Sequence, residues 1–217
     1  MKGQSTKRHD KLRNLTTAQC NSSGVPASSE PRPDGFANAQ SPKLLRPDGQ
    51  QHFTQCLSLT DTTVVHPTSK SYLPKGKGTK HGSAPLLDAI KFKKNKYDKE
   101  DDDNSVAARA GAIFTVLGAE TYGFMHQDYI NFLRLVAEEA DQCGLSGLDG
   151  AKRYHNFLRA EAAVCIQRAN SFMVSHWARN HAVFKKGKRP SFSVVNLLAR
   201  GNRPGRRFVF PTTFSGA

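Results

Sequence analysis

Apolar residues recur along the second half of the chain with the period of an α-helix. Between residues 129 and 140 they stand at i, i+3, i+4, i+7, i+8 and i+11, which predicts a helix that begins near Asp128 and ends before Gly144. A similar period predicts a long helix over residues 152–179. Its expected core positions are Tyr154, Phe157, Leu158, Ala162, Cys165, Ala169, Phe172, Met173 and Trp177.

The first half of the chain predicts shorter elements. Residues 6–19 have the pattern of a short amphipathic helix, and residues 25–30 that of a short edge strand within a loop rich in Ser, Pro and Gly. Residues 84–99 predict a helix that bears the apolar residues Leu86, Leu87, Ile90 and Phe92 together with several lysines. The largely apolar run 112–122 is typical of a buried strand that ends near Glu120. Helices and strands of this kind predict an α/β (α+β) fold.

Residues 44–67 place two aspartates on neighbouring extended segments. Asp48 follows Pro47 and precedes Gly49, and the apolar residues 53–59 favour a strand. Asp61 opens a β-branched run that stops at Pro67. Carboxylates at the ends of adjacent strands can share one divalent metal ion, because hard cations bind oxygen ligands. Alternatively both aspartates are solvated turn residues, since Pro-Asp-Gly is a common turn.

Composition favours a polyanionic partner. The 217 residues carry a net charge of +14 with a pI near 9.9, and nucleic acid is the usual partner of such a protein, although charge does not separate DNA from RNA. The four cysteines form no CxxC pair, so neither a zinc module nor a disulfide framework is indicated. No apolar run approaches about twenty residues, so we expect neither a membrane span nor a secretory signal.

Basic residues accumulate without acids beyond Glu161. This asymmetry makes the C-terminal arm a candidate phosphate contact, and the alternative is a flexible basic tail without a specific role. The residues expected to bind nucleic acid are Lys185, Lys186, Lys188, Arg189, Arg203, Arg206 and Arg207.

Six short motifs follow one another along the chain in a recognisable order. They are Arg8-His9-Asp10, Glu30-Pro31, Arg46-Pro47-Asp48, Asp61-Thr62-Thr63-Val64, Lys93 to Lys96-Tyr97, and Glu120-Thr121-Tyr122-Gly123. The series resembles the restriction-enzyme-like endonuclease region at the C-terminal end of reverse-transcriptase proteins in site-specific non-LTR retrotransposons. The resemblance covers about residues 7–180, including a closing helix with the sequence AVCIQRAN at 163–170.

The resemblance implies a PD-(D/E)XK-like fold, in which a small mixed sheet is flanked by helices. The expected divisions are an N-terminal basic segment (1–22), an endonuclease-like core (23–127), a helical pair packing on it (128–180) and a basic, mostly flexible tail (181–217). By resemblance, Asp48 and Asp61 are the catalytic acids that bind Mg²⁺ or Mn²⁺, and Glu30 is an outer ligand. The lysine usually found two residues after the second acid is replaced by Thr63. Lys93 and Lys96 match the family's relocated lysines.

Phosphodiester hydrolysis explains why such residues belong together. The reaction needs an activated water and neutralisation of developing negative charge, which an acid-held metal ion and a lysine can supply. Tyr97 is expected to pack, Glu120 to end its strand, and His66 and His126 to be ordinary loop residues.

The resemblance further implies a role for the chain. It would nick DNA in the nucleus to prime reverse transcription, with RNA as a further partner and the polymerase on a longer protein, because Tyr-x-Asp-Asp is absent from this sequence. A truncated or inactive copy is the first alternative. The second is a non-catalytic basic nucleic-acid-binding protein.

Overall fold

The structure is a computed structural model that describes residues 2–31, 47–67, 84–98, 105–147 and 150–184. Residues 1–171 form one compact unit and residues 172–217 a second. Four strands build one sheet in the order β1 (Ala27–Ser29), β2 (Gly49–His52), β3 (Leu57–Val65), β4 (Ala112–Glu120). The β1–β2 and β2–β3 pairs are antiparallel, whereas β3 and β4 are parallel. The predicted small mixed sheet is therefore confirmed.

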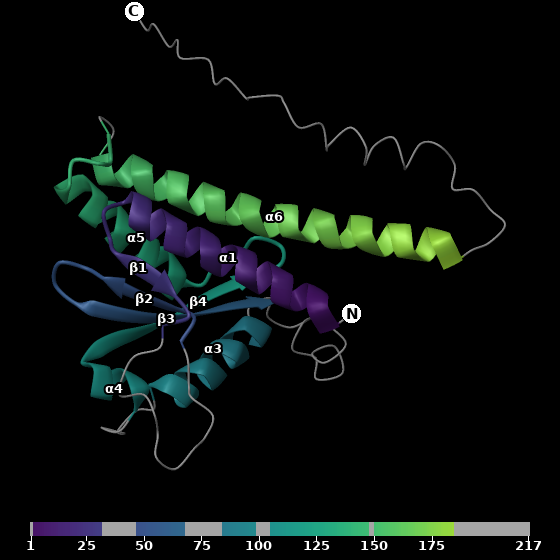
Figure 1. Cartoon of the computed structure of the whole chain (residues 1–217), viewed down its shortest axis with the longest axis horizontal. Coiled ribbons are helices and arrows are strands. Elements are labelled where there is room, and N and C mark those ends of the chain that lie inside the picture. The colour runs from purple at the N-terminus through teal and green to yellow at the C-terminus, as the bar shows by residue number, and fades with distance from the viewer. Residues whose placement is uncertain (1, 32–46, 68–83, 99–104, 148–149, 185–217) are drawn as a thin grey trace, which may run out of the picture. The chain divides into compact units, whose positions relative to one another are not determined.

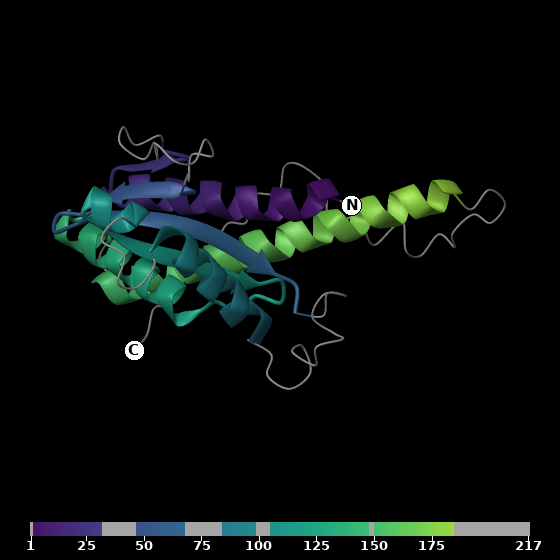
Figure 2. The same cartoon turned by 90° about the horizontal axis from the view of Figure 1, so that it is seen from below.

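Helices cover both faces of this sheet (Figures 1 and 2). Helices α3 (Ala84–Tyr97) and α4 (Val106–Ala110) lie in the connection between β3 and β4 and pack on one face. Helices α1 (Lys2–Ser22) and α5 (Gln127–Gln142) pack on the other face, together with the part of α6 (Gly150–Phe184) that precedes residue 172. Because strand side chains alternate between faces, β3 and β4 contribute to two separate apolar cores.

The core that involves α1, α5 and α6 follows from the helical periods of the sequence. Leu12, Tyr129, Leu133 and Leu158 are buried together in it. Helix α5 begins after His126, whose side chain accepts a hydrogen bond from the Asp128 backbone N–H, and it ends before Gly144, which adopts a φ of +69°. All six predicted apolar positions of α5 are buried, so the prediction for this helix is confirmed.

A close contact fixes the position of α3 on the sheet. A Cβ atom on Gly118 of β4 would lie 2.8 Å from Ile90 Cδ1 of α3, closer than real Cβ contacts. The absence of a side chain at Gly118 therefore lets α3 approach β4. Helix α3 carries Lys93 one turn after Ile90, so the same contact sets the height of that lysine above the sheet.

Three predictions differ from the structure. Asp61 lies at the centre of β3 and not at a strand end, because β3 already begins at Leu57. Residues 53–56 form a turn, closed by the bond from Phe53 N–H to the Cys56 carbonyl, because β2 ends at His52. In α6, three expected core residues are substantially exposed: Phe157, Phe172 and Trp177 are 53%, 42% and 48% exposed. The helical period identified α6 correctly but overestimated how much of this helix is buried.

The remaining elements agree with the predictions to within a few residues. The expected edge strand is β1, the expected buried strand is β4, and the helix predicted at 84–99 is α3. Helix α1 is longer than predicted at both ends. None of the helices described here is long and apolar enough to cross a membrane.

Candidate active site

Asp48, just before β2, lies opposite Asp61 of β3. The antiparallel register places Gly49 opposite Thr60, so Asp48, the next residue outward, faces Asp61. Asp48 Oδ2 accepts a hydrogen bond of 2.7 Å from the backbone N–H of Thr62. The Asp48 side chain is 16% exposed and that of Asp61 only 1%. Neither is a solvated turn residue, and that alternative is excluded.

Helix α3 provides the cation that contacts Asp61. Lys93 Nζ lies 2.8 Å from Oδ1 and 3.0 Å from Oδ2 of Asp61. A lysine at position 63 would approach from β3 itself, but Thr63 stands there. The β2–β3 register thus brings Asp48 and Asp61 together, and Lys93 joins them from α3, 32 residues beyond Asp61.

Helix α1 adds a histidine that the sequence analysis gave no role. His9 Nε2 lies 2.7 Å from Asp48 Oδ2. His9, Asp48 and Asp61 each offer a ligand atom within 4.8 Å of the others, and they are the one such group of three found among the described residues. A signal for His9 was present in the sequence. It shares a helical face with the buried residues Leu12 and Thr16, so a polar side chain interrupts a core-facing stripe.

Burial and charge separate the pKa values of the two aspartates. Burial, reinforced by the negative charge of Asp48, raises the pKa of Asp61 to about 6 even though Lys93 opposes the rise. Burial would also raise the pKa of Asp48, but the hydrogen bond with His9 and further bonds outweigh it and lower the pKa. The hydrogen bond with Asp48 raises the pKa of His9. Asp48 is therefore the carboxylate that ionises first.

Lys96 and Tyr97 lie at the edge of this group. Lys96 Nζ donates a hydrogen bond of 2.8 Å to the Tyr97 hydroxyl and sits 4.4 Å from the centroid of its ring. Partial burial, followed by the charge of Lys93, lowers the pKa of Lys96. Tyr97 is buried, as expected, and desolvation raises its pKa. Lys93 contacts an acid directly, whereas Lys96 acts on the two acids only through their charges.

The structure does not bring the Glu30 carboxylate into the cluster. Glu30 forms an ion pair with Arg13 of α1, and its backbone N–H donates a 2.8 Å hydrogen bond to the Asp48 carbonyl. The backbone of Glu30 therefore supports the Asp48 segment, while its side chain points to another partner. The predicted nucleic-acid contacts from Lys185 to Arg207 lie outside the described residues.

The donor set fits a divalent cation. Two carboxylates held on a rigid sheet suit Mg²⁺ and Mn²⁺, and an imidazole nitrogen favours a transition metal such as Mn²⁺ over Mg²⁺. Lys93 currently neutralises Asp61, but it is 26% exposed and has a flexible stem, so it can withdraw when a cation binds.

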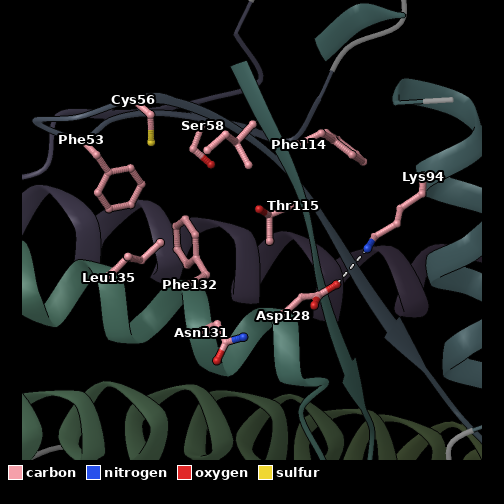
Figure 3. Close-up of a pocket in the computed structure, with 11 residues that line it drawn as sticks. Phe53, Cys56, Ser58, Lys94, Phe114, Thr115, Asp128, Asn131, Phe132 and Leu135 are labelled. Atoms are coloured by element: carbon pink, nitrogen blue, oxygen red, sulfur yellow. Dashed lines mark ion pairs between the residues drawn. The ribbon is translucent and has the colours of Figure 1, made fainter. Parts of the chain in front are cut away.

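A separate cleft of about 240 Å³ runs beside β4, between α3 and α5 (Figure 3). Apolar side chains such as Phe132 and Leu135 line it, and an ion pair of 3.2 Å between Lys94 and Asp128 crosses one end. None of the predicted catalytic residues lines this cleft. Lys94 and Asp128 instead tie α3 to α5.

Comparison with known proteins assigns no family. No protein-family model matches the chain, and no curated protein matches its sequence. The function must therefore be inferred from the site itself.

Proposed function

We propose that the chain is a metal-dependent endonuclease that nicks DNA, with an active site of the PD-(D/E)XK type. The observation that carries the proposal is the convergence of Asp48, Asp61, His9 and Lys93. Two acids on adjacent extended segments, with a lysine in contact with the second acid, are the side chains that metal-assisted phosphodiester hydrolysis requires.

The arrangement of the sheet supports this proposal. A mixed sheet with helices on both faces carries one acid just before β2 and the other in the middle of β3. Lys93 approaches the second acid from α3, which compensates for Thr63 at the usual lysine position. These features support a PD-(D/E)XK-like fold and the resemblance to the endonuclease region of non-LTR retrotransposon proteins.

Each side chain has a distinct task in this proposal. Asp48, oriented by the Thr62 backbone, and Asp61 would hold the cation, and His9 would complete the ligand set. A bound divalent cation lowers the pKa of water and neutralises charge on a phosphoryl oxygen. Lys93, once released from Asp61, carries a positive charge to the scissile phosphate. Lys96 keeps the surroundings electropositive.

The partners follow from the activity and the net charge of +14. DNA is the proposed substrate, RNA a further ligand, and a polymerase on a longer element protein would extend the nicked 3′ end. Such a role would place the protein in the nucleus. A non-catalytic nucleic-acid-binding protein remains the competing function.

Nicking of supercoiled plasmid tests the proposal. We expect the purified chain to convert supercoiled to open-circular DNA with Mn²⁺ or Mg²⁺ and not with EDTA. Asp48→Asn and Asp61→Asn should abolish the reaction and leave DNA binding in EDTA intact. Asp98→Asn, which changes an exposed carboxylate just after α3, serves as the control. Metal-independent nicking, or full activity in both site variants, would reject the nuclease function.

A further inference from the structure

A second polar cluster lies beyond the acids, at the carboxyl ends of the parallel strands β3 and β4. Thr121 follows β4 directly, and its backbone N–H donates a 2.9 Å hydrogen bond to the carbonyl of Val65, the last residue of β3. Thr121 Oγ1 lies 2.8 Å from His66 Nδ1. Asn170 of α6 donates from its side-chain amide to the Thr121 carbonyl. Ligands of open α/β sheets commonly bind at this end of the strands.

Arg8 of α1 completes the cluster and brings a permanent positive charge to it. Its Nη1 donates a 3.1 Å hydrogen bond to Asn170 Oδ1, which is a neutral acceptor. The Arg8 Nε is buried without a hydrogen-bond partner, and none of the described carboxylates forms an ion pair with Arg8. A partly buried guanidinium whose hydrogen-bond partner is neutral would be stabilised by a nearby anion.

The neighbouring groups agree with an electropositive site. Burial, with the positive charge of Arg8 as a further cause, lowers the pKa of His66. Glu120 precedes Thr121, and burial raises the pKa of its carboxyl. Glu120 Oε1 is buried without a hydrogen-bond partner, and among the described residues Glu120 forms no ion pair with Arg8.

We propose that Arg8, oriented by Asn170, forms an anion subsite that binds a backbone phosphate of the DNA strand away from the scissile one. The inference rests on the proposed nuclease function. Val65 is four residues beyond Asp61 on β3, which corresponds to about 13 Å along the strand. This spacing corresponds to a phosphate a few nucleotides from the cleavage point.

The alternative is that Arg8 is purely structural and cross-links α1 to α6 through Asn170. A structural arginine would change stability when replaced but would not change the charge dependence of DNA binding. The two roles therefore separate in a salt titration.

The first test measures the affinity of the full chain for a short DNA duplex in EDTA by fluorescence anisotropy. The salt concentration is varied from about 50 to about 300 mM, because the salt dependence of the affinity reports the number of phosphate contacts. We expect Arg8→Ala to weaken binding about tenfold and to reduce the log–log salt slope by about one. Arg109→Ala is the matched control, because Arg109 is an exposed arginine of α4 at the opposite end of β4 and should leave the slope nearly unchanged. Arg8→Lys should restore most of the slope and covers the case in which Arg8→Ala fails to fold. An unchanged slope in folded Arg8→Ala would overturn the proposal.

A second test locates the phosphate. Single methylphosphonate linkages, which remove one phosphate charge, are placed in turn along one strand on both sides of a nick site. We expect one position, a few nucleotides from the nick, to weaken binding to the wild type but not to Arg8→Ala. Equal effects at every position in both proteins would overturn the assignment of Arg8 to a single phosphate.

The two proposals fail in different ways. The first outcome is that the chain nicks DNA with metal and that Arg8→Ala is as active and as salt-sensitive as the wild type. This outcome would support the nuclease function and reject the anion subsite. If no variant nicks DNA but the imidazole resonances of His66 shift with inorganic phosphate in the wild type and not in Arg8→Ala, the subsite stands without the nuclease.

Discussion

The replacement of Asp61 by Asn should stabilise the metal-free protein. Asp61 is buried, and its pKa is raised from its ordinary value of 3.8 to about 6. Between these two pH values the folded chain holds more protons than the unfolded chain, so the free energy of unfolding falls as the pH rises. At pH 8 the ionised carboxylate costs about 3 kcal/mol, at 1.36 kcal/mol for each pKa unit.

The expected gain is somewhat smaller than this cost. Asparagine has nearly the same shape and carries no charge, but Lys93 loses its carboxylate partner. Because Lys93 is 26% exposed and can reach water, we expect Asp61→Asn to gain about 1–3 kcal/mol at pH 8. The gain should shrink as the pH falls from 6 and disappear near pH 4, where Asp61 is protonated in the folded protein.

Chemical denaturation in EDTA across pH 4–8 measures this effect, and thermal unfolding should show a rise of about 2–4 °C per kcal/mol. Asp98→Asn removes an exposed carboxylate close to the same helix and should change stability little at any pH. A variant that is less stable than the wild type at pH 8, or a difference that does not depend on pH, would refute the assignment of Asp61 as a buried, destabilising carboxylate.

Three further predictions follow from the same contacts. Lys93→Met should leave the buried Asp61 without its cation and raise the pKa of Asp61 above about 6. The variant should nick DNA roughly 10²–10³-fold more slowly, measured as the plasmid nicking rate across a range of pH. Unaltered nicking would exclude Lys93 from the reaction. His9→Ala should weaken Mn²⁺ binding by roughly 10–100-fold. Because the pKa of His9 is raised, its proton competes with the cation. In calorimetric titrations, the affinity of the wild type for Mn²⁺ should therefore increase as the pH rises through the pKa of His9. The affinity of the variant should depend less on pH. Gly118→Ala should lower the free energy of unfolding by about 1–3 kcal/mol, because the new methyl group would lie 2.8 Å from Ile90. The variant should also nick DNA more slowly, because the displaced α3 shifts Lys93. A denaturation midpoint equal to that of the wild type would show that α3 moves freely.

Periodic segments were predictable from the sequence, since burial of one helical face leaves a direct pattern. Helix α5 was predicted almost to its ends, because its apolar stripe, Asp128 and Gly144 all agree. The two acids and Lys93 were identified through motif order, and their convergence depends on the β2–β3 register and on the packing of α3 against Gly118. Neither is visible in a single sequence, because both are long-range contacts. His9 was named in the first motif without a role for the same reason: its partner Asp48 is 39 residues away.

The contacts of α1 with α6 also determine when the protein can fold during its synthesis. Gln19 donates a hydrogen bond to the Leu158 carbonyl, and 139 residues separate the two. At about 5–20 residues per second, α1 waits roughly 7–28 s for its partner helix to be made. During that interval Leu12 and Cys20, which are buried in the finished protein, lack the α5 and α6 side chains that cover them. Apolar surface exposed in this way makes a partly folded chain prone to aggregation until α5 and α6 are complete.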